Sequence, residues 1–408
     1  MLRPILKRSR ASVLMRPGIL RGLSHLLSAA LAGATAEMLH AQTTAPLIEL
    51  GPPRFRTNAD EVELHRVRHA VVLAGGRVAV ADAGNHRVVI LTPQGRAERT
   101  VGRLGSGPGD FRSVDLLSTR GDTLFAYDAM LARVSKFDGK LRAIHSAQLP
   151  LHEGRPTTLR AFTDGGSVVV TSTAAHFRQP TGLLLNRVTV LSVPSDSPPR
   201  ILSTVDWSYS YHYAERTSST TYAVPFLGNA FLFRSGDGFT LVKLASNDVE
   251  IRDSSFKLLG IISVPARRLS FDRSHIDGYR DSLLKRIGNA ASPAYARVAT
   301  VFGPSFPVPR DRPVITDGAS VGRAVWLRLA VAGQPEMSEW LIVSTPRRVV
   351  SARVLLPRSS RVLGGSDDVV VVLERDDSGA ETICCDFQPG WPQAANPLLR
   401  GPGLLVIN

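Results

Sequence analysis

The first candidate binding site is an alternating aromatic segment. Its aromatic and histidine members are Trp207, Tyr209, Tyr211, His212 and Tyr213. Successive side chains of a strand point to opposite faces, so a strand here would place the tryptophan and the three tyrosines on one face. Such a face offers an aromatic platform for a sugar or a peptide. Packing of the same rings beneath a long loop is the structural alternative, and the sequence is compatible with both.

Histidines, carboxylates and cysteines give no recognisable catalytic set. The histidines are scattered and contain no His-Glu-x-x-His pair, the spacing that places two zinc ligands on one helical face. Two cysteines, Cys384 and Cys385, are too few for a four-thiolate zinc site. Because they are adjacent on a predicted strand, they point to opposite faces, and we expect one buried and one partly exposed thiol. A binding protein is therefore expected rather than an enzyme.

The composition fits a folded protein with anionic partners. The chain has 408 residues, of which 43% are hydrophobic, a normal fraction for a globular protein that excludes wholesale disorder. The formal net charge of +14 favours anionic partners without naming one.

Residues 1–41 have the pattern of a secretory signal peptide. A segment rich in Lys and Arg precedes an apolar run from Leu26 to Ala36, and small residues allow cleavage after Ala36 or Ala41. The run is shorter than the ~20 residues of a permanent transmembrane helix, so we expect no membrane anchor. An organelle transit peptide is the alternative interpretation, and Met15 is an alternative start. Export predicts a periplasmic or extracellular protein without nucleic-acid partners.

The remaining chain contains an internal repeat. Asp82 aligns with Asp128 and Arg87 with Arg133, both at a spacing of 46 residues. Each unit alternates apolar and polar residues at period two and is interrupted by turn residues, a pattern typical of short strands. Repeats of about 40–50 residues with four strands each are typical of β-propeller blades.

Two segments carry a family resemblance. Residues 80–88 (VADAGNHRV) resemble the core of an NHL repeat, and residues 100–111 (TVGRLGSGPGDF) resemble the inter-blade loop of exported bacterial six-bladed propellers, mostly of unknown function. The resemblance implies an all-β fold, a six-bladed β-propeller of four-stranded antiparallel blades. It says little about activity, because relatives include lyases, lactonase-like enzymes and binding scaffolds. The enzymes hold a divalent metal in the central channel, for which the predicted inner strands offer few ligands, such as Asp115 and Asn229.

Six blades are placed by their strand pattern, with five or seven as alternatives. Their approximate spans are 67–103, 114–149, 157–207, 229–265, 312–357 and 368–385. The last blade shows only three clear strands, so we expect residues 46–55 to supply its fourth strand and to close the ring, which removes two exposed edges. The predicted domains are the signal peptide 1–41, the propeller 42–390 and a Pro/Gly-rich tail 391–408.

Two insertions interrupt the regular spacing. The first, 207–228, holds the aromatic segment. The second, 266–311, has apolar residues at helical spacing from Ile276 onward, which predicts one short amphipathic helix across a propeller face. We expect Ser274 to cap its start and Gly288 to end it.

Charged pairs recur at the turn between the two middle strands of the first two repeats. The resemblance implies that Asp82 with Arg87, and Asp128 with Arg133, brace these turns and take no part in catalysis. Turn chemistry agrees, because an aspartate accepts backbone N–H bonds and a nearby arginine pairs with it.

The glycines of residues 102–109 suggest a phosphate-binding loop at first sight. Such a loop must open a helix, whereas the next predicted element is a strand that begins at Val114. We therefore expect a tight connector between blades, with Phe111 packed between them.

These features predict an exported propeller that binds a ligand or a protein on one face, which the aromatic segment and the helical insertion shape. The expected partner is a protein, a peptide or a glycan of the cell envelope, and no cofactor is expected. The alternative is a metal-dependent lactonase-like or lyase-like enzyme with its site in the central channel and a divalent metal as cofactor. The chain is expected to be a monomer.

Overall fold

The computed structural model describes residues 45–172, 180–215, 218–243, 246–264, 269–309, 311–330 and 336–387. The chain divides into two compact units, Met1–Ala45 and Pro46–Asn408, and the described residues belong almost wholly to the second. The predicted signal peptide, 1–41, and the predicted tail, 391–408, lie outside the described residues.

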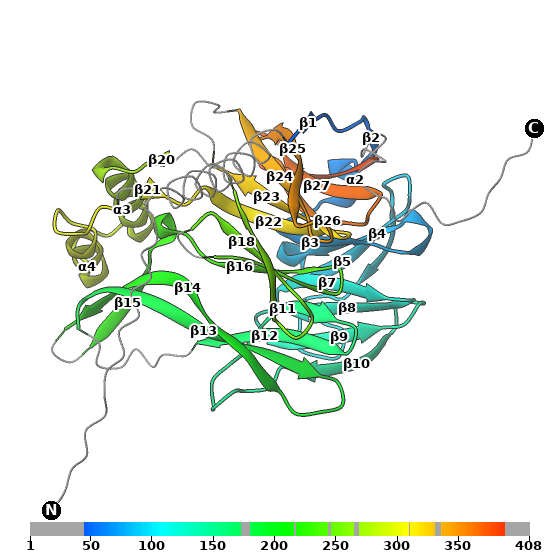
Figure 1. Ribbon diagram of the computed structural model, residues 1–408, viewed down its shortest axis with the longest axis horizontal. Helices are drawn as coiled ribbons and strands as arrows, with labels where there is room; N and C mark the ends of the chain where they lie inside the picture. Colours follow the sequence, from blue (N-terminus) through cyan, green and yellow to red (C-terminus); the bar gives the residue numbers. More distant parts are fainter. Residues whose placement is uncertain are drawn as a thin grey trace, which may run out of the picture. The chain divides into compact units, whose positions relative to one another are not determined.

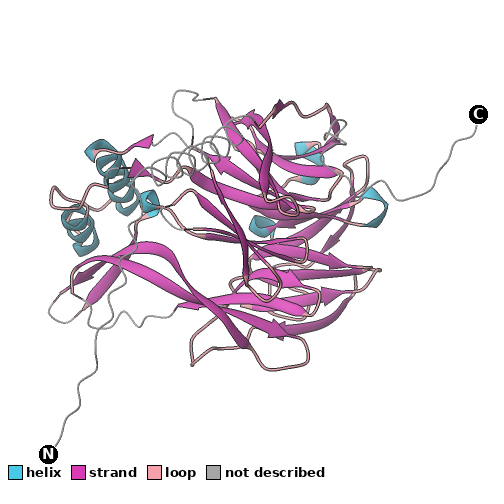
Figure 2. Cartoon of the chain, in the orientation of Figure 1, coloured by secondary structure: helices cyan, strands magenta, loops and turns pink. Residues whose placement is uncertain are grey.

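The described part of the second unit is mostly β-structure, in six main sheets whose consecutive strands pair antiparallel (Figures 1 and 2). The first sheet contains β3 (Val67–Val72), β4 (Val78–Asp82), β5 (Arg87–Leu91) and β6 (Ala97–Val101). The second contains β7 (Val114–Arg120), β8 (Thr123–Asp128), β9 (Arg133–Phe137) and β10 (Ala143–Gln148). The third contains β11 (Thr158–Thr163), β12 (Gly166–Ser172), β13 (Gly182–Pro194), β14 (Arg200–Ala214) and β15 (Ser219–Ala223).

The remaining three sheets follow in chain order. The fourth contains β16 (Phe231–Ser235), β17 (Gly238–Val242), β18 (Asp248–Arg252) and β19 (Leu258–Ser263). The fifth contains β22 (Ile315–Val321), β23 (Ala324–Leu329), β24 (Met337–Ser344) and β25 (Val349–Pro357). The last contains β26 (Arg361–Gly365), β27 (Val369–Arg375) and β28 (Glu381–Phe387). This series of small antiparallel sheets is consistent with a propeller.

The first sheet is buried on both faces because it lies between two others. Along β4, Val78 and Val80 pack against residues of the last sheet, whereas Ala79 and Ala81 pack against residues of the second. All four side chains are fully buried. A strand that is covered on both faces has apolar residues at successive positions, which explains the unbroken apolar run of Val78 to Ala81 in β4.

The two adjacent cysteines are both buried and form no disulfide. Cys384 packs between the fifth and last sheets, and Cys385 packs between the last and first. They point to opposite faces, but the expectation of one partly exposed thiol is wrong. Neighbouring sheets cover both faces of β28, so neither position of the strand reaches solvent.

Segments from the two ends of the described chain pair with each other. β2 (Pro53–Arg56) pairs antiparallel with β28 as the fourth strand of the last sheet, and β1 (Leu47–Ile48) lies parallel to β25. Glu381, at the start of β28, is 4% exposed and accepts a hydrogen bond from the backbone N–H of Val67 at 2.8 Å. The same carboxylate accepts from Nε of Arg375 at 3.1 Å. Glu381 therefore joins the last sheet to the first strand of the first sheet.

Replacement of Glu381 by alanine is expected to lower the free energy of unfolding by about 2 kcal/mol, because the buried N–H of Val67 loses its acceptor. Glu381→Gln keeps an acceptor oxygen and should lose about half as much. Urea unfolding followed by circular dichroism measures both values. An alanine variant as stable as the unaltered protein would show that this contact does not hold the two sheets together.

The third sheet extends further than the sequence analysis predicts. β13 and β14 are 13 and 15 residues long, and β15 pairs with the end of β14. Residues 207–214 therefore belong to this sheet, and the predicted insertion at 207–228 begins too early. The strand continues because its distal part packs against a separate core of helices, so its burial does not end with the repeat.

The segment between the fourth and fifth sheets forms two helices in its described residues, where one was predicted. They are α3 (Arg273–Ile287) and α4 (Pro293–Val301). Asp272, not Ser274, caps α3, because its carboxylate accepts the Ser274 N–H and His275 completes a capping box. Gly288 ends α3 as predicted.

Several short elements complete the described chain. Two further short strands, β20 (Leu269–Ser270) and β21 (Asp311–Arg312), pair with each other. The short helices are α2 (Ala59–Val62) and the 3-10 turns η1 (Ala74–Gly76), η2 (Ala83–Asn85) and η3 (Pro225–Leu227).

Candidate functional site

The first charged turn binds backbone groups. The carboxylate of Asp82 is fully buried, accepts from the backbone N–H of His65 at 2.9 Å and forms an ion pair with Nε of Arg87 at 2.7 Å. Arg87 donates in turn to the carbonyl of Val62 at 2.8 Å. The pair therefore fastens the chain before the first sheet to the turn.

The second charged turn is arranged differently. Asp128 accepts backbone N–H bonds from Ser113 at 3.1 Å and from Leu131 at 2.9 Å. Arg133 donates to the carbonyl of Asp110 at 2.6 Å, within the glycine-rich connector. Among the ion pairs of the described residues, none joins Arg133 to Asp128. The two equivalent arginines thus anchor different segments: Arg87 contacts the chain before the first sheet, and Arg133 contacts the glycine-rich connector.

The three tyrosines of the aromatic segment lie under the helices. Tyr209, Tyr211 and Tyr213 are half-buried and pack against the core that α3 and α4 share with β14. The ring centroid of Tyr211 is 5.2 Å from that of Phe306. These rings serve as the packing surface beneath the helical segment, and a ligand platform formed by them stays a prediction.

Trp207 packs against a different core, which the third and fourth sheets share, and His212 alternates with the tyrosines on β14. The pairing of β13 with β14 shifts between Asp206 and Ser208, so Trp207 is the extra residue of a β-bulge. His212 is 1% exposed, and its Nδ1 lies 3.4 Å from Oγ1 of Thr221. The structure therefore does not gather the five predicted residues into one site.

The first strands of the six sheets line a cavity of about 560 Å³, here called the axial cavity. Each of β3, β7, β11, β16, β22 and β26 contributes side chains to its wall. β3 lies against β7 and β26, and β16 lies against β11 and β22, so these strands surround the cavity. The volume is in the range of small-molecule sites.

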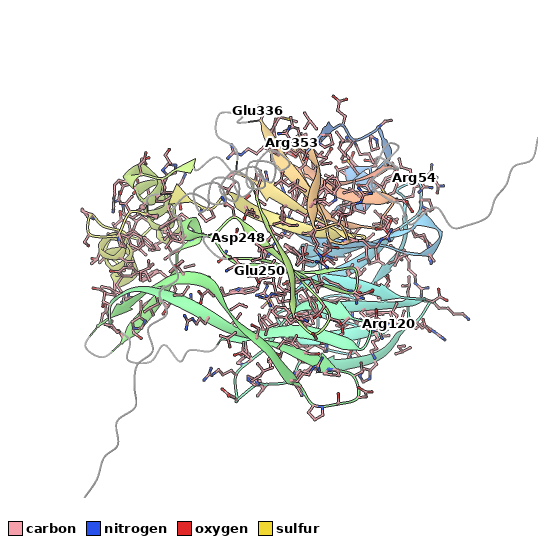
Figure 3. The ribbon with its side chains drawn as sticks, in the orientation of Figure 1. Arg54, Arg120, Asp248, Glu250, Glu336 and Arg353 are labelled. Atoms are coloured by element: carbon pink, nitrogen blue, oxygen red, sulfur yellow. The ribbon has the colours of Figure 1, made fainter. Side chains whose placement is uncertain are left out.

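Three of the four arginines that line the axial cavity have a carboxylate partner. The pairs and their N–O distances are Arg361 with Asp317 at 2.8 Å, Arg234 with Asp164 at 3.0 Å, and Arg68 with Asp115 at 3.9 Å. A buried carboxylate away from the cavity has cationic partners as well. Glu250, labelled in Figure 3, lies 2.9 Å from Nε of Arg252 and 3.6 Å from Nζ of Lys243.

Arg160, on β11, is the exception. Among the described residues no ion pair includes it, and its Nε is shielded from solvent without a hydrogen-bond partner. The guanidinium carbon lies 4.9 Å from the ring centroid of Trp207, a cation–π contact. Burial lowers the pKa of Arg160, and the nearby Tyr127 opposes that shift. Because an arginine stays protonated in proteins, the axial cavity holds a positive charge that no carboxylate neutralises.

His69 lies in the same wall, and its Nδ1 accepts the backbone N–H of Leu117 at 3.4 Å. Burial, with a smaller effect of Arg361, lowers the pKa of His69 to about 4, so the ring is neutral at pH 7. Burial likewise raises the pKa of Asp115, while the Ser113 hydroxyl lowers it. Of the two predicted metal ligands, Asp115 lines the axial cavity, whereas Asn229 is not part of its wall.

Sequence reasoning missed Arg160 and a second feature of the wall. The pairing of β11 with β12 shifts between Leu159 and Ala161, so Arg160 is a bulge residue that no period-two pattern identifies. Residues 318–322 read Gly-x-Ser-x-Gly, the spacing of a nucleophile elbow. They lie at the end of β22 and in the turn to β23, not at a strand-to-helix turn, and the Ser320 hydroxyl donates to a backbone carbonyl at 2.7 Å. This serine has the environment of a strand residue.

The described residues also bear on metal binding and membrane insertion. No group of three or more His, Cys, Asp or Glu side chains there is placed to hold a metal ion. No helix in that part of the chain is long and apolar enough to cross a membrane. The channel metal of the enzyme alternative stays a prediction.

No protein-family model and no curated protein matches the sequence. Several solved structures are similar to this chain over most of its length. A candidate exported protein from Bacteroides fragilis is 10% identical, with 83% of this chain and 95% of that chain covered and a TM-score of 0.46. A DUF4221 family member from Bacteroides vulgatus is 9% identical over 84% and 99% of the two chains, with a TM-score of 0.44.

Another similar structure is virginiamycin B lyase from Staphylococcus aureus. It is 9% identical over 79% of this chain and 95% of that chain, with a TM-score of 0.38. At these identities and TM-scores the likenesses carry no argument about activity.

Proposed function

We propose that the protein is an exported, six-bladed, NHL-like β-propeller that acts as a ligand-binding module and takes a small anionic ligand into the axial cavity. The six main sheets would be its blades, and β2 would close the ring. The signal-peptide pattern of residues 1–41 supports export to the periplasm or the extracellular space. The module would act as a monomer without a cofactor.

The unpaired charge of Arg160 carries this proposal. A charge removed from water is costly unless a partner compensates it, and the other arginines of the cavity wall have such partners. Arg160 has the indole of Trp207 on one side and a buried Nε–H without an acceptor. An anion that enters the cavity would supply the missing charge.

Of the predicted aromatic set, Trp207 would contact the ligand, whereas the tyrosines would have a structural role. Trp207 lines the axial cavity beside Arg160. Tyr209, Tyr211 and Tyr213 would hold α3 and α4 on the end of the third sheet. The ligand would therefore lie in the cavity and not on the helical insertion.

Replacement of Arg160 by methionine is expected to weaken anion binding about thirtyfold, since a hydrogen bond to a charged group contributes about 2 kcal/mol. Isothermal titration calorimetry with benzoate, hexanoate and inorganic phosphate measures this change. Lys136→Met is the matched control, because it removes one positive charge from β9, outside the axial cavity. Equal losses in the two variants, or no binding of any of the three anions, would contradict the proposed function.

A further inference from the structure

The charge balance of the axial cavity limits the charge of its ligand. Among the described residues of the wall, three arginines are matched one to one by carboxylates, which leaves Arg160 as the single unmatched cation there. His69 adds no charge, because its ring is neutral at pH 7. The cavity therefore has one positive charge in excess, enough for one negative charge on a ligand.

A second negative charge on the ligand would meet no free cation. Asp115 and Asp317 belong to the same wall, and both already engage an arginine. A dianion would either leave one charge unpaired in a confined site or compete with these carboxylates for their partners. Both outcomes cost binding free energy, so the wall selects against dianions.

The donors left on Arg160 suit a carboxylate. Its guanidinium presents N–H groups in a planar fork, and the guanidinium carbon lies 4.9 Å from the ring centroid of Trp207. Because Nε is shielded from solvent, the edge that a ligand in the cavity would use is the one formed by the two terminal amino groups. A carboxylate accepts two parallel N–H bonds from such an edge, which is the common bidentate geometry.

The rest of the wall suits an apolar ligand body. Partly exposed apolar side chains line the cavity together with the charged groups; they include Val71, Leu116, Trp207, Phe231 and Phe233. The volume of about 560 Å³ accommodates a body of ordinary metabolite size. A compact hydrated ion such as phosphate would leave this apolar surface without contact.

We infer that the ligand of the axial cavity is a monocarboxylate with an apolar or aromatic body, whose carboxylate pairs with Arg160. This inference rests on the proposed function and narrows it from small anions in general to one chemical class.

Calorimetric titration of the purified protein at pH 7 with matched probes tests the inference. Benzoate and hexanoate are the monocarboxylates, benzamide is the neutral isostere, phthalate is the dianion, and inorganic phosphate is the compact anion. At least one monocarboxylate is expected to bind tenfold or more tightly than each of the other three probes. Arg160→Lys should weaken that binding about tenfold, because an ammonium group lacks the planar fork. Unchanged circular dichroism of the variant shows that it is folded.

The outcomes separate this inference from the proposed function. If phthalate or phosphate binds most tightly, the monocarboxylate assignment is overturned while anion binding in the cavity stands. Equal affinities for benzoate and benzamide would overturn the pairing with Arg160. If none of the five probes binds at millimolar concentration, the inference and the proposed function are both overturned.

Discussion

Replacement of Phe111 by alanine is expected to lower the free energy of unfolding by about 4 kcal/mol, as for other fully buried phenylalanines. Phe111 has no exposed surface and packs in the core between the first and second sheets. Its ring centroid lies 6.1 Å from that of Phe137. Truncation would remove these contacts and leave a void that the two sheets cannot close, because their backbones are held by their own ladders.

Chemical unfolding of matched variants measures this effect. Phe111→Leu keeps most of the volume and should cost less than about 1.5 kcal/mol. Gly102→Ala tests the same contact from the opposite side, because a Cβ at Gly102 would lie 2.3 Å from the Phe111 ring and the backbone there has a φ of +87°. Alanine and leucine variants of equal stability would show that the ring does not fill this core.

Acidification is expected to remove up to about 3 kcal/mol of stability through His69, between pH 6.5 and pH 4. The folded-state pKa of His69 is about 4, against 6.5 for the free side chain. Above pH 6.5 both states hold a neutral ring, so the stability is fully present. Between the two values the unfolded chain binds a proton that the folded protein excludes, so the stability falls as the pH falls. The loss of about 3 kcal/mol is an upper limit, because part of the His69 ring faces the interior of the axial cavity.

A comparison of pH–stability curves isolates the contribution of His69. His69→Gln does not titrate, and its side-chain oxygen can still accept the Leu117 N–H. Its curve is expected to be flatter than that of the unaltered protein between pH 6.5 and pH 4. His145→Gln, a change of an exposed histidine on β10, should leave the curve as it is. Parallel curves for the unaltered protein and His69→Gln would refute the expectation.

The strand content could be predicted because its signals are local. Turn residues separate β4 from β5, and the same spacing separates β8 from β9. Gly288 marks the end of α3 in the sequence because a helix commonly ends at a glycine. These features depend on neighbours within a few residues, and the chain itself contains that information.

The elements that were missed depend on contacts between distant segments. α4 has only nine residues, too few for a clear helical period, and it is stabilised by packing in the core beneath α3. The extension of β14 beyond residue 207 also depends on that core. The same packing covers the tyrosines, whose pattern in the sequence was compatible with an open platform.

The sequence by itself determined that this chain forms many short strands in a repeating series, because period-two alternation and turn residues act locally. Only the tertiary structure decided which side chains meet in the axial cavity. Arg160 and Trp207 are both bulge residues on strands of the third sheet, and a bulge turns a side chain out of the regular alternation. Whether a charge is left unpaired depends on every carboxylate that the other sheets bring near it. Those carboxylates lie far apart in the sequence, so no single segment of the chain predicts the pairing.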